Sequence, residues 1–134
     1  MEDLRDPDNP SQLILAEETY AIVGAAMEVY YKLGTGFLEP VYQQTLAIEL
    51  GMRDVPFVAQ RRFQIEYKGH LIDKEYIADF VCFDQIIVEI KALNQLSPVD
   101  WSQVLNYLKV SKMRVGLLFN FGSVGRLEWK KLVI

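Results

Sequence analysis

Two strongly apolar runs of strand length constrain this chain more than any other feature. They lie in residues 76–92, and each carries a carboxylate at its centre, Asp79 in the first run and Glu89 in the second. An isolated carboxylate in such surroundings costs several kcal/mol unless it is paired or binds a metal. Lys91 follows Glu89 by two residues, so their side chains share one face of a strand. The runs therefore predict a buried sheet with a charged cluster.

The charges have two interpretations, which the spacing leaves open. Two carboxylates and an ammonium on one patch can hold a divalent cation and a water molecule. Alternatively, Lys91 forms a buried ion pair with Glu89 or Asp79 that fixes the register of the strands.

The loop between the two runs decides whether the carboxylates meet. With a two-residue turn at 84–85, Asp79 lies opposite Ile90, and Glu89 points to the other face of the sheet. With a three-residue loop at 83–85, Asp79 lies directly across from Glu89. A site built from both carboxylates therefore requires an odd loop or a bulge.

Three segments have apolar residues at helical spacing. Gly51 is expected to end the second helix, and Ser97 with Asp100 is expected to cap the start of the third. The predicted helices span residues 17–33, 39–50 and 98–112.

Strand patterns alternate with these helices and define the fold class. A period of two after Pro56 predicts a hairpin leading into the central runs, with a solvated segment or bulge at 73–75. Because a helix between two strands forms a crossover, the strand at 114–120 should lie parallel to the strand at 86–92. A half-exposed strand at 126–134 follows. The order predicts an α/β fold with a mixed central sheet.

The composition favours one domain spanning residues 1–134, with residues 1–12 as a loosely ordered N-terminal arm. Cys82, the one cysteine, falls in a predicted buried strand, which excludes an internal disulfide and a set of cysteine metal ligands. The acidic N-terminus and the lack of a long apolar run predict a cytoplasmic protein with no membrane contact.

The formal net charge of −4 disfavours strong non-specific binding to nucleic acid, because Lys and Arg supply most of that affinity. The same net charge is compatible with a local basic patch. The cations available for it are Arg61, Arg62, Lys109, Lys112, Arg114, Lys130 and Lys131.

Four short motifs together resemble a known family. Asp79, nine intervening residues and Glu89-Ile90-Lys91 form a D…ExK signature. GxxExxY at 36–42, QxxxY at 103–107 and a GLLxNFG strand at 116–122 accompany it. From about residue 17 onward the chain resembles the GxxExxY protein family, a RecB-like branch of the PD-(D/E)XK nuclease superfamily. The resemblance implies a restriction-endonuclease-like αβββαβ core.

The resemblance also implies a metal-dependent nuclease that hydrolyses phosphodiester bonds, with DNA preferred over RNA. Asp79, Glu89 and the carbonyl of Ile90 would bind Mg²⁺ or Mn²⁺. Glu39 would complete the acidic set or hold a second metal through water.

Three further residues receive roles from the same resemblance. Lys91 would orient or deprotonate the attacking water and offset charge on the phosphate. Gln103 and Tyr107 would position the site and the nucleic-acid backbone.

Two other functions stay open. A catalytically silent module of the same fold would bind nucleic acid or a protein partner and keep the ExK pair as a structural salt bridge. The same metal site would also suit hydrolysis of small phosphoesters or nucleotides. An exposed final strand makes a homodimer by edge pairing a further hypothesis.

Overall fold

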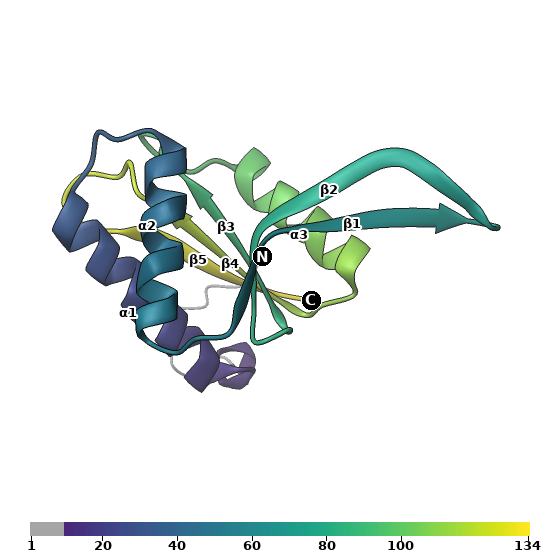
Figure 1. Ribbon diagram of the computed structural model, residues 1–134, viewed down its shortest axis with the longest axis horizontal. Helices are drawn as coiled ribbons and strands as arrows, with labels where there is room; N and C mark the ends of the chain where they lie inside the picture. The colour runs from purple at the N-terminus through teal and green to yellow at the C-terminus, as the bar shows by residue number, and fades with distance from the viewer. Residues whose placement is uncertain (1–9) are drawn as a thin grey trace.

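Five strands form one mixed sheet at the centre of the molecule (Figure 1). A computed structural model describes residues 10–134 of the chain. β3 and β4 are parallel, as the crossover predicts, and each other pair of neighbours is antiparallel. The strands lie in the sheet in chain order, β1 (Phe57–Tyr67), β2 (His70–Cys82), β3 (Ile86–Lys91), β4 (Val115–Asn120) and β5 (Glu128–Val133).

Three helices cover the two faces of this sheet. α1 (Ala16–Leu33) and α2 (Glu39–Met52) pack on one face, and α3 (Pro98–Ser111) packs on the other (Figure 1). α3 begins at the predicted cap, where the backbone N–H of Ser97 donates to the carboxylate of Asp100 at 2.8 Å. The α/β order predicted from the sequence is therefore confirmed, with helices on both faces.

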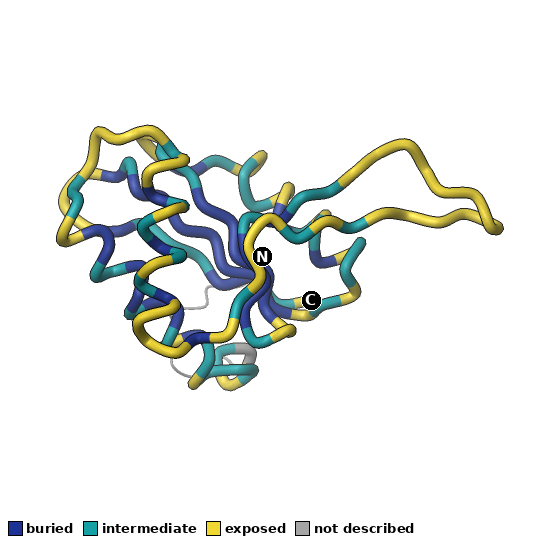
Figure 2. The backbone as a smooth tube through the Cα atoms, in the orientation of Figure 1, coloured by how far each residue is buried: buried dark blue, intermediate teal, exposed yellow. Residues whose placement is uncertain are grey.

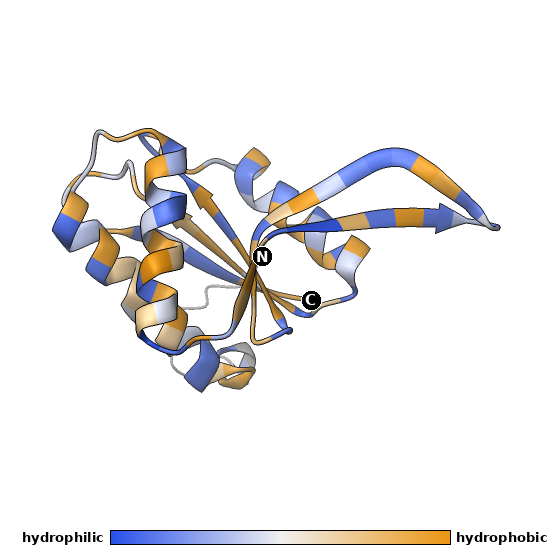
Figure 3. Ribbon diagram, in the orientation of Figure 1, coloured by the Kyte–Doolittle hydropathy of each residue, from blue (hydrophilic) through white to orange (hydrophobic). Residues whose placement is uncertain are grey.

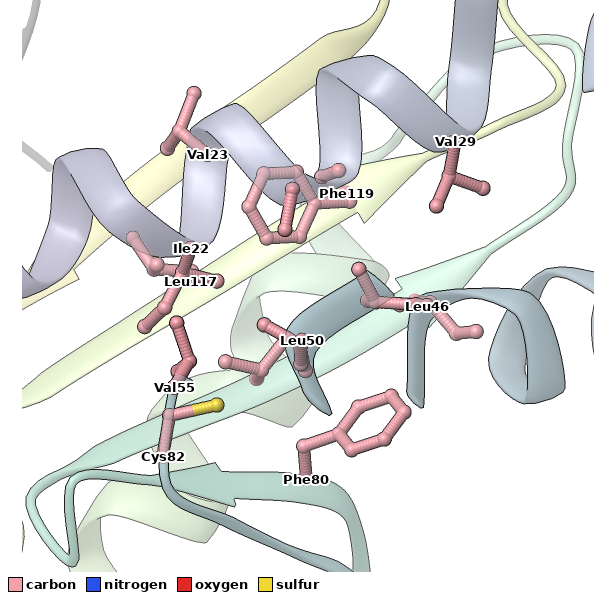
Figure 4. Close-up of a cluster of buried hydrophobic side chains, with 14 of the residues drawn as sticks. Ile22, Val23, Val29, Leu46, Leu50, Val55, Phe80, Cys82, Leu117 and Phe119 are labelled. Carbon is pink, nitrogen blue, oxygen red and sulfur yellow. The ribbon is translucent and has the colours of Figure 1, made fainter. Parts of the chain in front are cut away.

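The larger core lies between the sheet and the α1–α2 pair. Figure 4 shows Ile22 and Val29 of α1 and Leu46 of α2 directed toward Phe80 and Phe119 on the strands. Burying one such side chain contributes about 1.5–3 kcal/mol. Apolar residues dominate the central strands (Figure 3), so the burial that stabilises the sheet also fixes the register of the charged residues on it.

β1 and β2 continue beyond the body of the molecule as a two-stranded ribbon, here called the hairpin arm and defined as residues 61–78. Most of the arm is exposed (Figure 2). The register shifts between the pairs Gln64↔Glu75 and Glu66↔Leu71, so three residues of β2 face one of β1. This irregularity confirms the bulge expected at 73–75.

The N-terminal segment differs from the expected loose arm. Residues 1–9 of that arm lie outside the described residues, and Pro10–Leu13 forms the 3₁₀ helix η1. The ammonium of Lys131 in β5 donates to the carbonyls of Gln12 at 3.1 Å and Ile14 at 2.6 Å. Lys131 is therefore a buried anchor, and its inclusion among the available surface cations is wrong.

The end of α2 differs from the prediction, and the described helices are not suited to crossing a membrane. α2 ends at Met52, so Gly51, expected to terminate it, lies inside its last turn. Among the described residues, the helices lack the combination of length and apolar character that a membrane crossing requires.

Candidate active site

The connection between β2 and β3 brings the two central carboxylates together. The pairs Phe80↔Val88 and Cys82↔Ile86 leave a three-residue loop at 83–85 and place Asp79 across from Glu89. Phe83 and Asp84 in the loop have φ values of 55° and 56°, in the left-handed region. Of the two loop geometries that the sequence allowed, the structure has the one that a shared site requires.

β2 is also irregular at Asp79 itself. Ala78 packs in the cluster under α3, whereas Phe80 packs in the cluster under α1 and α2. Residues two apart on a regular strand share a face, so the strand rotates locally at Asp79. Gln60, its neighbour across β1, has a left-handed φ of 54°. An odd loop and a local irregularity thus occur together.

β2 and β3 separate beyond this point, and side chains replace the backbone ladder. The N–H of Ile90 donates to Oδ2 of Asp79 at 2.9 Å, and the N–H of Asp79 donates to Oε1 of Glu89 at 3.1 Å. Each carboxylate therefore satisfies a backbone donor of the opposing strand. These bonds fix both side chains at the separation of the two strands.

The carboxylate of Asp79 disfavours the charge of Glu89. Burial raises the pKa of Glu89 well above its ordinary value, and the neighbouring Asp79 raises it further. Partial burial also raises the pKa of Glu39, with Asp79 as the second cause and Lys91 as the opposing influence. Without a cation Glu89 therefore holds a proton that an ordinary carboxyl group releases at neutral pH.

Lys91 is half-buried beside the pair but forms no ion pair with it. The ion pairs among the described residues join Arg53 to Glu49, Arg61 to Asp84 and Arg62 to Glu75. The sequence interpretation of Lys91 as the partner of Glu89 or Asp79 in a buried ion pair is therefore wrong. Lys91 acts on Glu89 and Glu39 only through its electrostatic field.

The acidic pair fits a hard divalent cation. Mg²⁺ is commonly held by one or two carboxylates and keeps several waters, and a cation would remove the repulsion between Asp79 and Glu89. The backbone of Ile90 faces this edge of β3, since its N–H donates to Asp79. The described residues contain no group of three or more His, Cys, Asp or Glu side chains gathered as metal ligands. Glu39 therefore stays outside the set that the resemblance implies.

Glu39 is nevertheless placed by a specific latch. It is the first residue of α2, and the loop before it is held by Tyr42, the last residue of the GxxExxY motif. The hydroxyl of Tyr42 donates to the carbonyl of Gly34 at 2.6 Å, and its ring stacks on Phe121 at 4.8 Å. The tyrosine of the motif thus holds the start of α2 against the sheet.

The two residues of the QxxxY motif lie in different environments on α3. The hydroxyl of Tyr107 donates to the carbonyl of Ile77 at 2.9 Å, and its ring meets Tyr76 edge-on at 5.7 Å. Burial raises the pKa of Tyr107, and Glu89 and Asp79 raise it further. Gln103 is exposed. Tyr107 therefore supports β2 beside the acidic pair, whereas Gln103 faces solvent.

Sequence reasoning missed a clamp at the carboxyl end of β3. Buried Asn120 of β4 accepts from the N–H of Leu93 at 2.8 Å and donates to its carbonyl at 2.9 Å. It also donates to Glu128 at 3.0 Å, and Glu128 accepts from the N–H of Leu96. A Cβ on Gly122 would lie 2.3 Å from the carbonyl of Leu93. The clamp fixes the loop that leaves Lys91.

Comparisons with known proteins agree with this geometry. A family model described as the PD-(D/E)XK nuclease superfamily matches residues 16–132. A solved structure titled "Crystal structure of SSO0001" is similar, with a TM-score of 0.54 and 16% sequence identity. That match covers 70% of this chain and 48% of the other, and at this identity it shows the fold alone. No curated protein matches the chain.

Proposed function

Because this chain belongs to the PD-(D/E)XK nuclease superfamily, we propose that it hydrolyses phosphodiester bonds of nucleic acid, DNA in preference to RNA, with a divalent metal ion at Asp79 and Glu89. The observation that carries the proposal is the placement of these two carboxylates opposite each other on neighbouring strands. Neither carboxylate belongs to an ion pair among the described residues. The motifs of the chain support its placement in the GxxExxY, RecB-like branch of the superfamily.

Asp79, Glu89 and the carbonyl of Ile90 would hold Mg²⁺ or Mn²⁺, and Glu39 would act on the site through water or a second metal. When bound, the cation supplies positive charge that polarises a phosphoryl oxygen. The chain's own contribution is to fix the two carboxylates, which the hydrogen bonds from Ile90 and Asp79 do before any ligand arrives.

Lys91 supplies the remaining positive charge of the cluster. It shares the α3 face of β3 with Glu89 and is free of ion pairs among the described residues. Its ammonium is therefore available to orient the attacking water and to offset charge that develops on the phosphate. Tyr107 acts behind it as a positioning residue that supports β2, and exposed Gln103 would contact the nucleic-acid backbone.

The test is cleavage of labelled single- and double-stranded DNA and RNA in the presence of Mg²⁺, Mn²⁺ or EDTA. Asp79→Asn and Lys91→Ala are compared with Asp73→Asn and Lys109→Ala, which make the same chemical changes at exposed positions. We expect metal-dependent cleavage by the wild type and both controls, and its loss in both site variants.

Equal cleavage by all five proteins would identify a contaminating nuclease and reject the proposal. If no substrate is cut, the effect of Mn²⁺ on the melting temperature separates two cases. A rise in the wild type that is absent in Asp79→Asn would support a metal site with another substrate, such as a small phosphoester. No rise in either protein would favour the catalytically silent binding module.

A further inference from the structure

The two faces of the hairpin arm differ sharply in chemistry. Paired residues of neighbouring strands share a face, and residues two apart along a strand do as well. One face, here called the arm face, lies on the same side as α3, because Phe63 packs in the cluster under α3 and Tyr76 meets Tyr107. The arm face carries the apolar and aromatic side chains Phe63, Ile65, Tyr67, Ile72 and Tyr76.

Cations lie on the arm face, and carboxylates lie on the opposite face. The ammonium of Lys68 is 5.5 Å from the centre of the Tyr67 ring, and that of Lys74 is 5.5 Å from the centre of the Tyr76 ring. The opposite face carries Glu66, Asp73 and Glu75 and, with them, Arg62, whose guanidinium is 3.1 Å from the carboxylate of Glu75.

The exposed part of the arm face has rings and cations without neutralising acids. Tyr67 is 61% exposed and Ile65 and Ile72 are exposed as well. Arg61, over the ring of Phe63 at 4.9 Å, is excluded from this set, because it also lies 3.6 Å from the carboxylate of Asp84. An acid-free surface of aromatic rings and ammonium groups is complementary to a polyanion that carries flat apolar rings.

The inner end of the arm face lies close to the acidic pair. Its inner end is Tyr76, which contacts Tyr107 on α3, and the hydroxyl of Tyr107 bonds the carbonyl of Ile77. Asp79 follows two residues later on the same strand. The arm face therefore ends at α3, two residues along β2 from Asp79, and the base of the arm lies beside α3 in Figure 1.

We infer that the arm face binds a single-stranded segment of nucleic acid and directs it toward Asp79 and Glu89. Bases stack on the exposed ring of Tyr67 and its apolar neighbours, and Lys68 and Lys74 contact phosphates. A single strand is the occupant because the bases of a duplex are stacked on one another and do not offer their faces to a protein ring. The inference deepens the proposed function and rests on it for the identity of the substrate.

The test measures binding without cleavage. In an Asp79→Asn background with EDTA, the affinity for a labelled single-stranded DNA is compared with that for RNA of the same sequence and for the duplex. Tyr67→Ala on the arm face is matched by Leu71→Ala, an equally exposed apolar residue on the opposite face. Lys74→Gln is matched by Arg62→Gln, which removes the same charge from the opposite face. Circular dichroism verifies that each variant is folded.

We expect tighter binding of a single strand than of the duplex. Tyr67→Ala should weaken that binding about tenfold, through loss of a stacking platform, while Leu71→Ala leaves it unchanged. Lys74→Gln should lower the slope of log affinity against log salt by about 0.7, the value for one phosphate contact on a single strand. Arg62→Gln should not change that slope.

Equal losses in the matched variants, or preferential binding of the duplex, would overturn the inference even if the wild type cleaves nucleic acid. The opposite pair of results would separate the two proposals as well. If the matched variants differ as expected but no metal restores cleavage in the wild type, the arm face is a nucleic-acid site and the nuclease proposal fails instead.

Discussion

Glu89 in β3 and Lys131 in β5 are buried to the same extent, each with 5% of its surface exposed, but the fold treats their charges in opposite ways. The ammonium of Lys131 is satisfied by the carbonyls of Gln12 and Ile14. Glu89 faces the carboxylate of Asp79, which disfavours its charge. Burial alone therefore does not separate a structural charge from a functional one. The partner decides, and only the acidic pair has chemistry left for a ligand.

The largest expected difference between these two residues is in catalysis. Glu89→Gln keeps the size of the side chain and its acceptor for the N–H of Asp79, but it removes one of the proposed metal ligands. We expect cleavage to fall on the order of 10³-fold, equivalent to several kcal/mol of lost charge stabilisation. Lys131→Met should cleave at the wild-type rate per folded molecule. Single-turnover rates at saturating metal measure both.

A Glu89→Gln variant that cleaves as fast as the wild type would show that the acidic pair is as structural as Lys131. A loss of cleavage in Lys131→Met alone, at a temperature where this variant is fully folded, would contradict the purely structural role of Lys131.

Stability should show the opposite ranking. Lys131→Met removes two charge-assisted hydrogen bonds and leaves the carbonyls of Gln12 and Ile14 without that donor. We expect its free energy of unfolding to fall by about 3 kcal/mol, whereas Glu89→Gln should lose almost nothing at pH 7 in EDTA. Urea unfolding followed by the fluorescence of Trp101 and Trp129, which pack against the two core clusters, measures both. Equal losses would mean that Glu89 is also a structural anchor.

The sequence predicts only part of this difference between Glu89 and Lys131. The helices and the crossover follow from local periodicity, and the charges at Asp79 and Glu89 stand out because strand residues around them are apolar. The three-residue loop does not follow, since a turn at 84–85 satisfies the same pattern and nothing in the sequence marks Phe83 for a left-handed φ.

Partners that are distant in the chain are the second part that the sequence does not reveal. Lys131 binds carbonyls more than a hundred residues away, and a side chain that needs backbone oxygens gives no residue-specific signal. The distance of Glu39 from the pair depends on how α2 sits on the sheet. Asn120 was visible as an amide inside an apolar run, and that burial cost could have indicated the clamp.

A smaller effect is expected in the pH dependence of stability, which should differ between the wild type and Glu89→Gln. Because the pKa of Glu89 is raised in the folded chain, the folded state keeps a proton that the unfolded state releases. This contribution is complete below the ordinary Glu pKa and is lost as pH rises through the raised value. We therefore expect Glu89→Gln to gain about 1–2 kcal/mol relative to the wild type between pH 5 and pH 9 in EDTA.

Metal should reverse that loss in the wild type only. In the proposed function Mn²⁺ binds the ionised pair, so the stabilisation by Mn²⁺ should grow with pH and be absent in Glu89→Gln. Thermal melts at several pH values, with Mn²⁺ or EDTA, measure both effects. A pH profile of Glu89→Gln that is parallel to the wild-type profile would show that Glu89 ionises like an exposed carboxylate.

The smallest effect is expected at Tyr107, whose hydroxyl donates its hydrogen bond to the carbonyl of Ile77 and not to either carboxylate. Tyr107→Phe keeps the ring against Tyr76 and removes one hydrogen bond, which should cost about 0.5–1.5 kcal/mol of stability. Tyr31→Phe, at an exposed position, is the matched control. If Tyr107 only positions β2, the rate at saturating substrate falls a few-fold, KM is unchanged, and the stability loss accompanies it. A raised KM with unchanged stability would instead mean that the hydroxyl leaves Ile77 to bind the substrate, and Tyr107 would then belong with Glu89 among the residues whose partner is the ligand.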